Sequence, residues 1–235
     1  MTRENSIQRP ETILFDFDGT LVNTTPLILR SFHETWQTHL GFSFADEVYI
    51  ATFGTHLLNA LGDLLDLGVK TGRHPAVSDR EQLIVEMLNT YRRINLYWHD
   101  SMVEPFPGID QMLELLRARG LRMGIVSSKM RAGVERGLRL FSLGGYFEDI
   151  IAAEDVSRHK PDPEPICLAM ERLGVTTAKT LYLGDSVHDI HAGRAALVQT
   201  AAAAWGPFPR QALVESGPDF ILDAPEDVER IIDNQ

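Results

Sequence analysis

Two carboxylates lie two positions apart at the end of a short apolar run near the start of the chain. They are Asp16 and Asp18 in the stretch FDFDGT, and Gly19 and Thr20 follow them. A strand that ends in an Asp-Gly turn would explain the pair. A second explanation is chemical, because a positioned carboxylate can act as a nucleophile and form a covalent intermediate. Gly19, which has no side chain, would then allow the backbone to come close to a bound phosphate.

Further polar groups are associated with three later segments. Ser127 and Ser128 follow the apolar run LRMGIV, Asp185 and Asp189 follow TLYLG, and Lys160 precedes a proline-rich helix start in HKPDPEP. Ligands of an open parallel sheet bind outside the carboxyl ends of its strands, so these side chains are expected to meet at one edge. Carboxylates suit a magnesium ion, and lysine and hydroxyl groups suit phosphate oxygens. Each group alone could also be a helix cap or a solvated side chain, so the prediction depends on the whole set.

The elements that would hold these residues alternate between strands and helices. Short apolar runs predict strands at Thr12–Phe15, Leu121–Val126, Thr180–Leu183, Leu197–Ala204 and Phe220–Leu222. Helical spacing of apolar residues predicts helices at Ile109–Arg119, Arg131–Leu140, Glu164–Leu173 and Ile190–Ala196. Such alternation is typical of an α/β fold in which helices cover both faces of a parallel sheet.

Residues 23–102 interrupt this alternation. No second strand arrives there at the spacing of a βαβ unit, and helical spacing instead predicts helices at Pro26–Leu40, His56–Leu67 and Ser78–Trp98. We therefore expect an all-helical cap over residues 23–102, inserted into a core formed by residues 1–22 and 103–235. The hinges would lie near Val22–Thr25 and Val103–Pro107.

Composition sets the general class of protein. The chain has 235 residues, of which 44% are hydrophobic and 8% aromatic, as in ordinary soluble globular proteins. A net charge of −11 argues against an extended nucleic-acid or membrane surface, since both need a basic face. The single cysteine, Cys167, excludes an internal disulfide, and the start MTRENSIQRP has no apolar signal-peptide region. We expect a cytoplasmic protein that binds a small phosphorylated substrate, with monomer and dimer both open.

Taken in order, the motifs resemble those of the haloacid dehalogenase-like hydrolase superfamily, across essentially the whole chain. The matching stretches are DFDGT at Asp16–Thr20, VSS at Val126–Ser128, Lys160 in KPDPEP, and GDSVHD at Gly184–Asp189. The resemblance implies a Rossmann-like parallel-sheet core with a helical cap inserted after the first strand. It also implies a phosphohydrolase that uses Mg²⁺.

The resemblance further implies a role for each core residue. Asp16 would be the nucleophile that becomes an aspartyl phosphate, and Asp18 would be the general acid and then the general base. Lys160 would neutralise charge on the phosphate and restrain Asp16. The metal ligands would be Asp16, the Asp18 carbonyl and Asp185, with Asp189 in support. The expected substrate contacts are Gly19, Thr20, Ser127, Ser128 and, in the cap, His56.

Asp18 also separates branches of the superfamily. Dehalogenating members lack this second aspartate, because displacement of a halide needs no proton, so phosphoryl transfer is the predicted reaction. Two stretches, TFGTHLLNAL and YRRINLYWHDSMVEPFPGI, resemble small bacterial phosphoglycolate phosphatases and the related pyrophosphatases. The expected substrate is therefore 2-phosphoglycolate or inorganic pyrophosphate. The sequence assigns no role to four further residues: Arg92, Arg93, His99 and His188.

Two alternatives use similar residues. A sugar-phosphate mutase would have the same fold and would return the phosphoryl group to a bound sugar phosphate behind a closed cap. A phospho-receiver signalling module also uses an aspartate, a hydroxyl residue and a lysine in this order. Receivers are shorter, have no insertion after the first strand and need no acidic pair after the lysine, which argues against that alternative.

Overall fold

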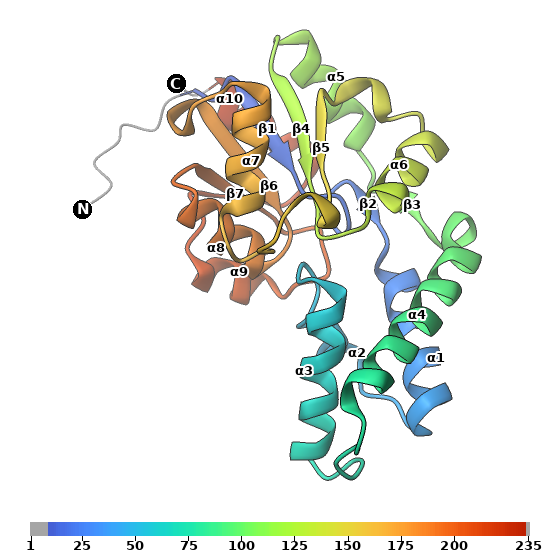
Figure 1. The fold of residues 1–235 in the computed structure, drawn as a ribbon. Coiled ribbons are helices and arrows are strands. Elements are labelled where there is room, and N and C mark those ends of the chain that lie inside the picture. The colour runs from blue at the N-terminus through green and yellow to red at the C-terminus, as the bar shows by residue number, and fades with distance from the viewer. Residues whose placement is uncertain (1–8, 234–235) are drawn as a thin grey trace.

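The computed structural model describes residues 9–233 and places a parallel sheet at the centre of the core (Figure 1). Its strands are β1 (Thr12–Phe15), β4 (Arg122–Val126), β5 (Asp149–Ile151), β6 (Thr180–Gly184), β7 (Gln199–Ala203) and β8 (Phe220–Leu222). They lie in the order β5-β4-β1-β6-β7-β8, and each pairs in parallel with its neighbours. The predicted α/β class is confirmed, and β1 lies between β4 and β6.

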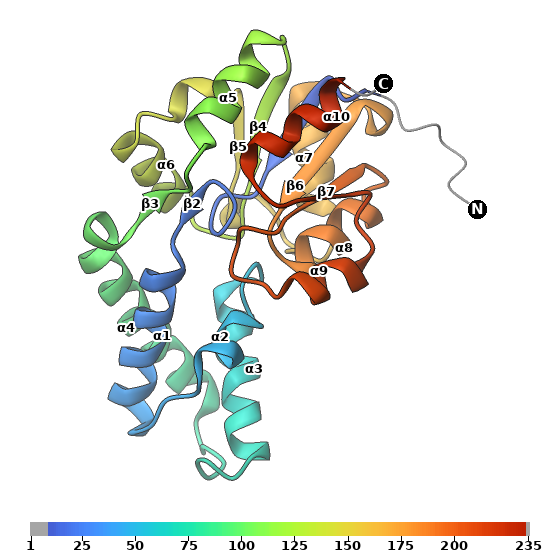
Figure 2. The ribbon, with the colours of Figure 1, turned by 180° about the vertical axis from the view of Figure 1, so that it is seen from behind.

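Helices cover both faces of the sheet, as Figure 1 and Figure 2 show from opposite sides. On one face pack α5 (Ile109–Ala118), α6 (Arg131–Leu140) and α10 (Glu229–Asp233). On the other face pack α7 (Glu164–Leu173) and α8 (Val187–Ala195), with α9 (Arg210–Ser216) beside α8. Side chains alternate along a strand, so Ile13 and Phe15 join the apolar core under α5 whereas Leu14 joins the core under α7.

Four further helices lie beyond the carboxyl ends of the strands: α1 (Thr25–Leu40), α2 (Asp46–Ile50), α3 (Leu57–Lys70) and α4 (Arg80–Met102). We call residues 23–102 the cap. Two short strands, β2 (Val22–Asn23) and β3 (Glu104–Pro105), pair antiparallel where the chain enters and leaves it. The expected hinges near Val22–Thr25 and Val103–Pro107 lie at this ribbon, and movement of the cap about them remains a prediction.

The cap has an aromatic core that continues into the sheet domain. Phe32 stacks on Tyr49 with ring centroids 4.9 Å apart, and it meets Tyr91 edge-on at 5.0 Å. The same apolar cluster includes Ile190 of α8 and Leu213 of α9. Because burial of apolar surface is favourable, these contacts stabilise the cap against the α8–α9 side of the core.

The structure differs from the sequence expectations at several short elements. Helix α8 begins three residues before the predicted Ile190, because Ser186 and Asp189 form a capping box at its start. The elements β5, α2, α9 and α10 are not predicted, and β5 and α2 are too short to show a period. Among residues 9–233, no helix is both long and apolar enough to cross a membrane.

Candidate active site

The carboxyl ends of three strands bring the predicted residues to one edge of the sheet. Asp16 follows β1, Ser127 follows β4 and Asp185 follows β6, and all three are buried. Lys160 enters from the loop before α7, and its side chain is only 1% exposed. Its Nζ lies 2.9 Å from Oδ1 of Asp16 and 2.7 Å from Oδ1 of Asp189. The predicted nucleophile, lysine and acidic pair therefore form one buried group.

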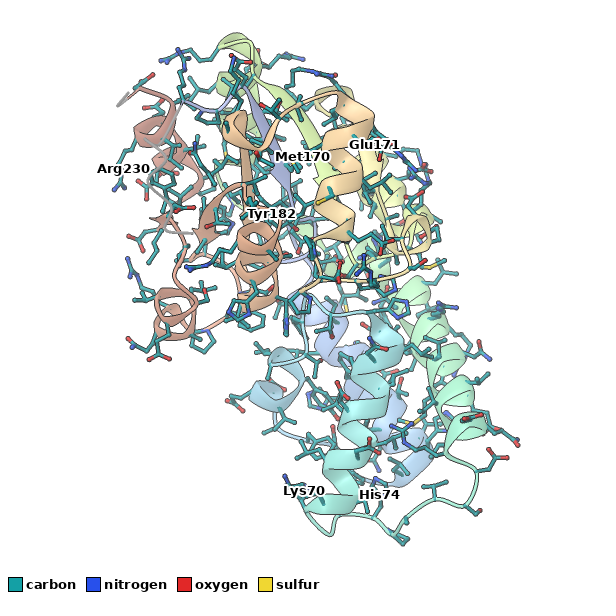
Figure 3. The ribbon with its side chains drawn as sticks, turned by 60° about the vertical axis from the view of Figure 1, so that its left-hand side comes forward. Lys70, His74, Met170, Glu171, Tyr182 and Arg230 are labelled. Carbon is teal, nitrogen blue, oxygen red and sulfur yellow. The ribbon has the colours of Figure 1, made fainter. Side chains whose placement is uncertain are left out.

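Lys160 has further partners that the sequence does not predict. Its Nζ donates to the hydroxyl of Tyr182 at 2.9 Å and to the carbonyl of Val126 at 3.2 Å. Tyr182 lies on β6 in the interior of the core (Figure 3), and its hydroxyl also donates to Oδ1 of Asp189 at 2.9 Å. A buried ammonium group needs such partners, because leaving it unpaired costs several kcal/mol. Tyr182 is thus a positioning residue for Lys160.

Burial and crowding determine the charges of the group. Burial is the main cause that raises the pKa of Asp16 from 3.8 to about 7; Lys160 opposes this rise, and Asp189 adds to it. Burial, followed by the charges of Asp189 and Asp16, raises the pKa of Asp185 well above its usual value. Burial alone would lower the pKa of Lys160, but Asp16 and Asp189 outweigh it and raise that pKa. Lys160 therefore stays charged, and Asp16 and Asp185 have too little positive charge around them.

This deficit fits a divalent cation. One carboxylate oxygen from each of Asp16, Asp185 and Asp189 lies within 4.8 Å of the others, and we call these three the acidic cluster. When all three are ionised, Lys160 balances one charge and leaves two negative charges in excess. Hard oxygen ligands with that charge suit Mg²⁺. Asp16 and Asp185 are the better placed ligands, because the oxygens of Asp189 are already bonded to Lys160 and Ser186.

Gly19 and Thr20 both pack against Asp185. A Cβ on Gly19 would lie 2.4 Å from Oδ2 of Asp185, and the φ of Gly19 is +81°, which favours glycine. Thr20 is fully buried, and its hydroxyl donates to Oδ1 of Asp185 at 3.0 Å. In this structure Thr20 positions Asp185, and its expected contact with substrate stays a prediction. The substrate contact expected of Gly19 stays a prediction.

Asp18 meets a second cation, one that is not among the residues predicted from the sequence. Its Oδ1 accepts a hydrogen bond from Nζ of Lys129 at 2.7 Å, and the two side chains are 21% and 14% exposed. Lys129 directly follows Ser128, and its backbone N–H donates to Oγ of Ser127 at 3.2 Å. The run VSSK could have indicated this contact, since a lysine just after a strand end can reach the edge of the sheet where Asp18 lies. The site therefore has a cation facing the carboxylate that is expected to move protons.

One loop of the cap, residues 51–56, lies on these strand ends, and we call it the cap loop. Oγ of Ser128 donates to the carbonyl of Gly54 at 2.7 Å. The Gly54 backbone also approaches Ser186 so closely that a Cβ would lie 2.6 Å from Oγ of Ser186. The ring of His188 hydrogen-bonds with the Ala51 backbone. In this arrangement Ser128 and His188 link the core to the cap, and the substrate contact expected of Ser128 stays a prediction.

The remaining residues of interest lie around the cap. His56, at the start of α3, stacks on His159 of the core. His99 is buried near the ribbon, and its Nδ1 lies 2.8 Å from Oδ1 of Asp100. This contact is structural, and His99 is not part of the acidic cluster. Two residues without an assigned role are exposed on α4: Arg92 and Arg93.

Comparison with known proteins agrees with this geometry. Residues 13–203 match the family model of haloacid dehalogenase-like hydrolases. The pyrophosphatase PpaX of Oceanobacillus iheyensis is 37% identical over 94% of this chain and 96% of its own, and that of Halalkalibacterium halodurans is 34% identical over the same shares. A crystal structure from Lactobacillus plantarum, assigned as a phosphoglycolate phosphatase, is 28% identical with a TM-score of 0.80. It covers 95% of this chain and 100% of its own.

A parallel sheet with a buried lysine and an acidic cluster at its strand ends is an α/β fold whose site suits a cation and an anionic group. The chain belongs to the haloacid dehalogenase-like hydrolase family, since the family model and the relatives each span most of it. The resemblance predicted from the four motifs is confirmed, and the named relatives fall in the two expected subgroups. Membership removes the phospho-receiver alternative.

Proposed function

We propose that the chain is a magnesium-dependent phosphohydrolase in which Asp16 accepts the phosphoryl group of a small anionic substrate and water then removes it. The main support is the contact of Asp16 with Lys160 inside a buried group that carries two negative charges in excess once its three carboxyl groups are ionised. A carboxylate and a phosphate repel each other, so such a site needs cations on both. Mg²⁺ held by Asp16 and Asp185 would supply the charge that lets the two anions meet.

In the first step, an oxygen of Asp16 forms a bond to phosphorus while the bond from phosphorus to the leaving group breaks. Lys160 fixes Oδ1 of Asp16 at 2.9 Å, which leaves the other oxygen for attack. Ser127 and Lys160 are the expected donors to the phosphate oxygens. Because Asp16 is 3% exposed, the acyl phosphate that results lies in a buried site.

Asp18 moves the protons in this scheme. Its carboxyl group donates a proton to the leaving-group oxygen, and the carboxylate then takes a proton from the water that attacks the aspartyl phosphate. Lys129 orients Asp18 through the 2.7 Å contact, and its ammonium group is placed to stabilise charge on the leaving group.

The relatives favour two substrates. Those named pyrophosphatases are 34% and 37% identical over nearly the whole chain, and a structure assigned as a phosphoglycolate phosphatase shares the fold. We therefore propose inorganic pyrophosphate as the first candidate and 2-phosphoglycolate as the second. The direct contact of the cap loop with the strand ends is compatible with a small substrate.

A substrate panel tests this proposal. We would compare kcat/KM for pyrophosphate, 2-phosphoglycolate and a hexose phosphate with Mg²⁺, with Asp16→Asn as the inactive reference. We expect pyrophosphate or 2-phosphoglycolate to exceed the hexose phosphate by at least about tenfold. A hexose phosphate that is preferred by that margin would instead favour the mutase alternative, and activity without added divalent cation would contradict the metal assignment.

A further inference from the structure

A histidine of the cap and a histidine of the core face each other across the entrance of the site. The rings of His56 and His159 are stacked, with centroids 4.1 Å apart and an angle of 6° between their planes. His56 ends the cap loop at the start of α3, and His159 directly precedes Lys160. The two residues come from segments about a hundred positions apart, so their contact exists only while the cap lies on the core.

The position of the pair is fixed by its neighbours. Gly54, which accepts the hydrogen bond from Ser128 and packs on Ser186, is two residues from His56. Two residues span at most about 7 Å, so His56 lies close to the strand ends. On the other side, His159 is bonded along the chain to Lys160, whose Nζ contacts Asp16. The pair therefore joins the cap loop to the loop that carries Lys160, at the cap side of the site.

The ring nitrogens of the pair are not committed to protein partners. Within residues 9–233, neither His56 nor His159 makes a hydrogen bond through its ring, and both side chains are partly exposed. A neutral imidazole carries one N–H donor, and a protonated one carries two. Two adjacent donors on parallel rings can bind the same anionic group.

The surroundings of the pair favour an anion. Burial, then His159 and then Arg92 lower the pKa of His56, so its charged neighbours are cationic. Burial also lowers the pKa of His159, and the one facing carboxylate, Glu164, opposes this. Glu164 is already bonded to the backbone N–H and the guanidinium of Arg158. The N-terminus of α3 adds partial positive charge at His56.

We propose that His56 and His159 together bind the anionic group of the substrate that is not transferred. In pyrophosphate this group is the outer phosphate, and in 2-phosphoglycolate it is the carboxylate. The inference rests on the proposed phosphohydrolase function and specifies its substrate selection. Because the pair forms only under a closed cap, it couples recognition of the second anion to closure over Asp16.

The test compares substrates with and without a second anionic group. We would measure kcat/KM for pyrophosphate and for p-nitrophenyl phosphate, whose leaving group carries no phosphate or carboxylate, in wild type, His56→Phe and His159→Phe. Phenylalanine keeps a stacked ring but removes the N–H donors. We expect the preference for pyrophosphate over the aryl phosphate to fall about tenfold in each variant, mainly through KM, as for loss of a hydrogen bond to a charged group.

Two controls separate this role from a structural one. His74→Phe makes the same change at the far end of the cap (Figure 3), and it should keep the preference. His56→Asn, which retains a side-chain N–H donor, should keep more of the preference for pyrophosphate than His56→Phe does. Equal losses on both substrates, or an unchanged preference in both phenylalanine variants, would overturn the proposal.

A binding measurement keeps the inference separate from the proposed reaction. Calorimetric titration of pyrophosphate with Mg²⁺ into Asp16→Asn protein should give a Kd about tenfold weaker when His56→Phe is added. If wild-type protein hydrolyses none of the substrates, the proposed function fails, while this titration still decides the role of the pair. An unchanged Kd would refute the role.

Discussion

Replacement of Gly54 by alanine tests whether the cap loop must lie on the strand ends for turnover. Gly54 has a φ of +83°, and a Cβ there would lie 2.6 Å from Oγ and 3.2 Å from Cβ of Ser186. Ser186 is not free to turn away, because its Oγ donates to Asp189 at 2.6 Å and accepts from the Asp189 N–H at 3.1 Å. Either the cap loop lifts, or the hydrogen bonds at the start of α8 break.

Two separate costs set the magnitude. An alanine at positive φ costs about 1–2 kcal/mol of folding free energy, and this cost is the same whether the cap is open or closed. The clash with Ser186 arises only when the loop is in place. Loss of a hydrogen bond to the Asp189 carboxylate costs about 1.5–3 kcal/mol. At about 1.4 kcal/mol per factor of ten, this second cost predicts a fall in kcat/KM of roughly 10- to 100-fold.

The assay pairs steady-state kinetics on pyrophosphate with urea unfolding. Gly72→Ala is the matched control, because Gly72 lies in the cap with φ of +69° and has no atom within 4 Å of an added Cβ. We expect similar losses of unfolding free energy in both variants and a loss of kcat/KM only in Gly54→Ala. The reasoning is refuted if Gly54→Ala keeps kcat/KM within about twofold of wild type, or if Gly72→Ala loses as much.

The charged groups of the site support two further predictions. Lys129→Gln removes the cation that lies 2.7 Å from Asp18. We expect kcat to fall about 10- to 100-fold, because the carboxyl group that transfers the proton loses its orientation. An unchanged kcat would contradict this role of Lys129. Burial raises the pKa of Asp16 from 3.8 to about 7, so the native state retains a proton that the unfolded chain has released. Stability without metal should therefore fall as pH rises from about 4 to 7. Because Mg²⁺ needs the ionised carboxylate, it should raise Tm more at about pH 8 than at about pH 6, and thermal unfolding that shows the reverse order would count against the site.

The backbone of the site is the part that the sequence predicts well. Strands of a parallel sheet are buried on both faces, so each is a continuous apolar run, and the end of the run marks where the first polar residue lies. This is why Asp16, Ser127 and Asp185 could be placed on one edge before any contact was known. Lys160 could be placed too, since the prolines after it mark the helix start.

Side-chain direction beyond the strand ends could not be predicted. Thr20 and Ser128 both lie next to residues of the site. The Thr20 side chain points inwards to Asp185, whereas that of Ser128 points outwards to Gly54 of the cap. Such directions depend on the turn and on the packing of distant segments. The roles of Tyr182 and Lys129 depend on tertiary contacts as well, with partners 22 and 111 positions away. The strand β5 has three residues, too few for a sequence pattern.

Chemical trapping of the phosphorylated enzyme tests the central claim most directly. Protein would be mixed with radiolabelled pyrophosphate and Mg²⁺, quenched in acid within one turnover, digested and analysed by mass spectrometry. We expect a phosphoryl group on the peptide that contains Asp16, its removal by hydroxylamine, and its absence in Asp16→Asn. Product formation with no label on that peptide at any time within the first turnover, or label on a different residue, would contradict the account.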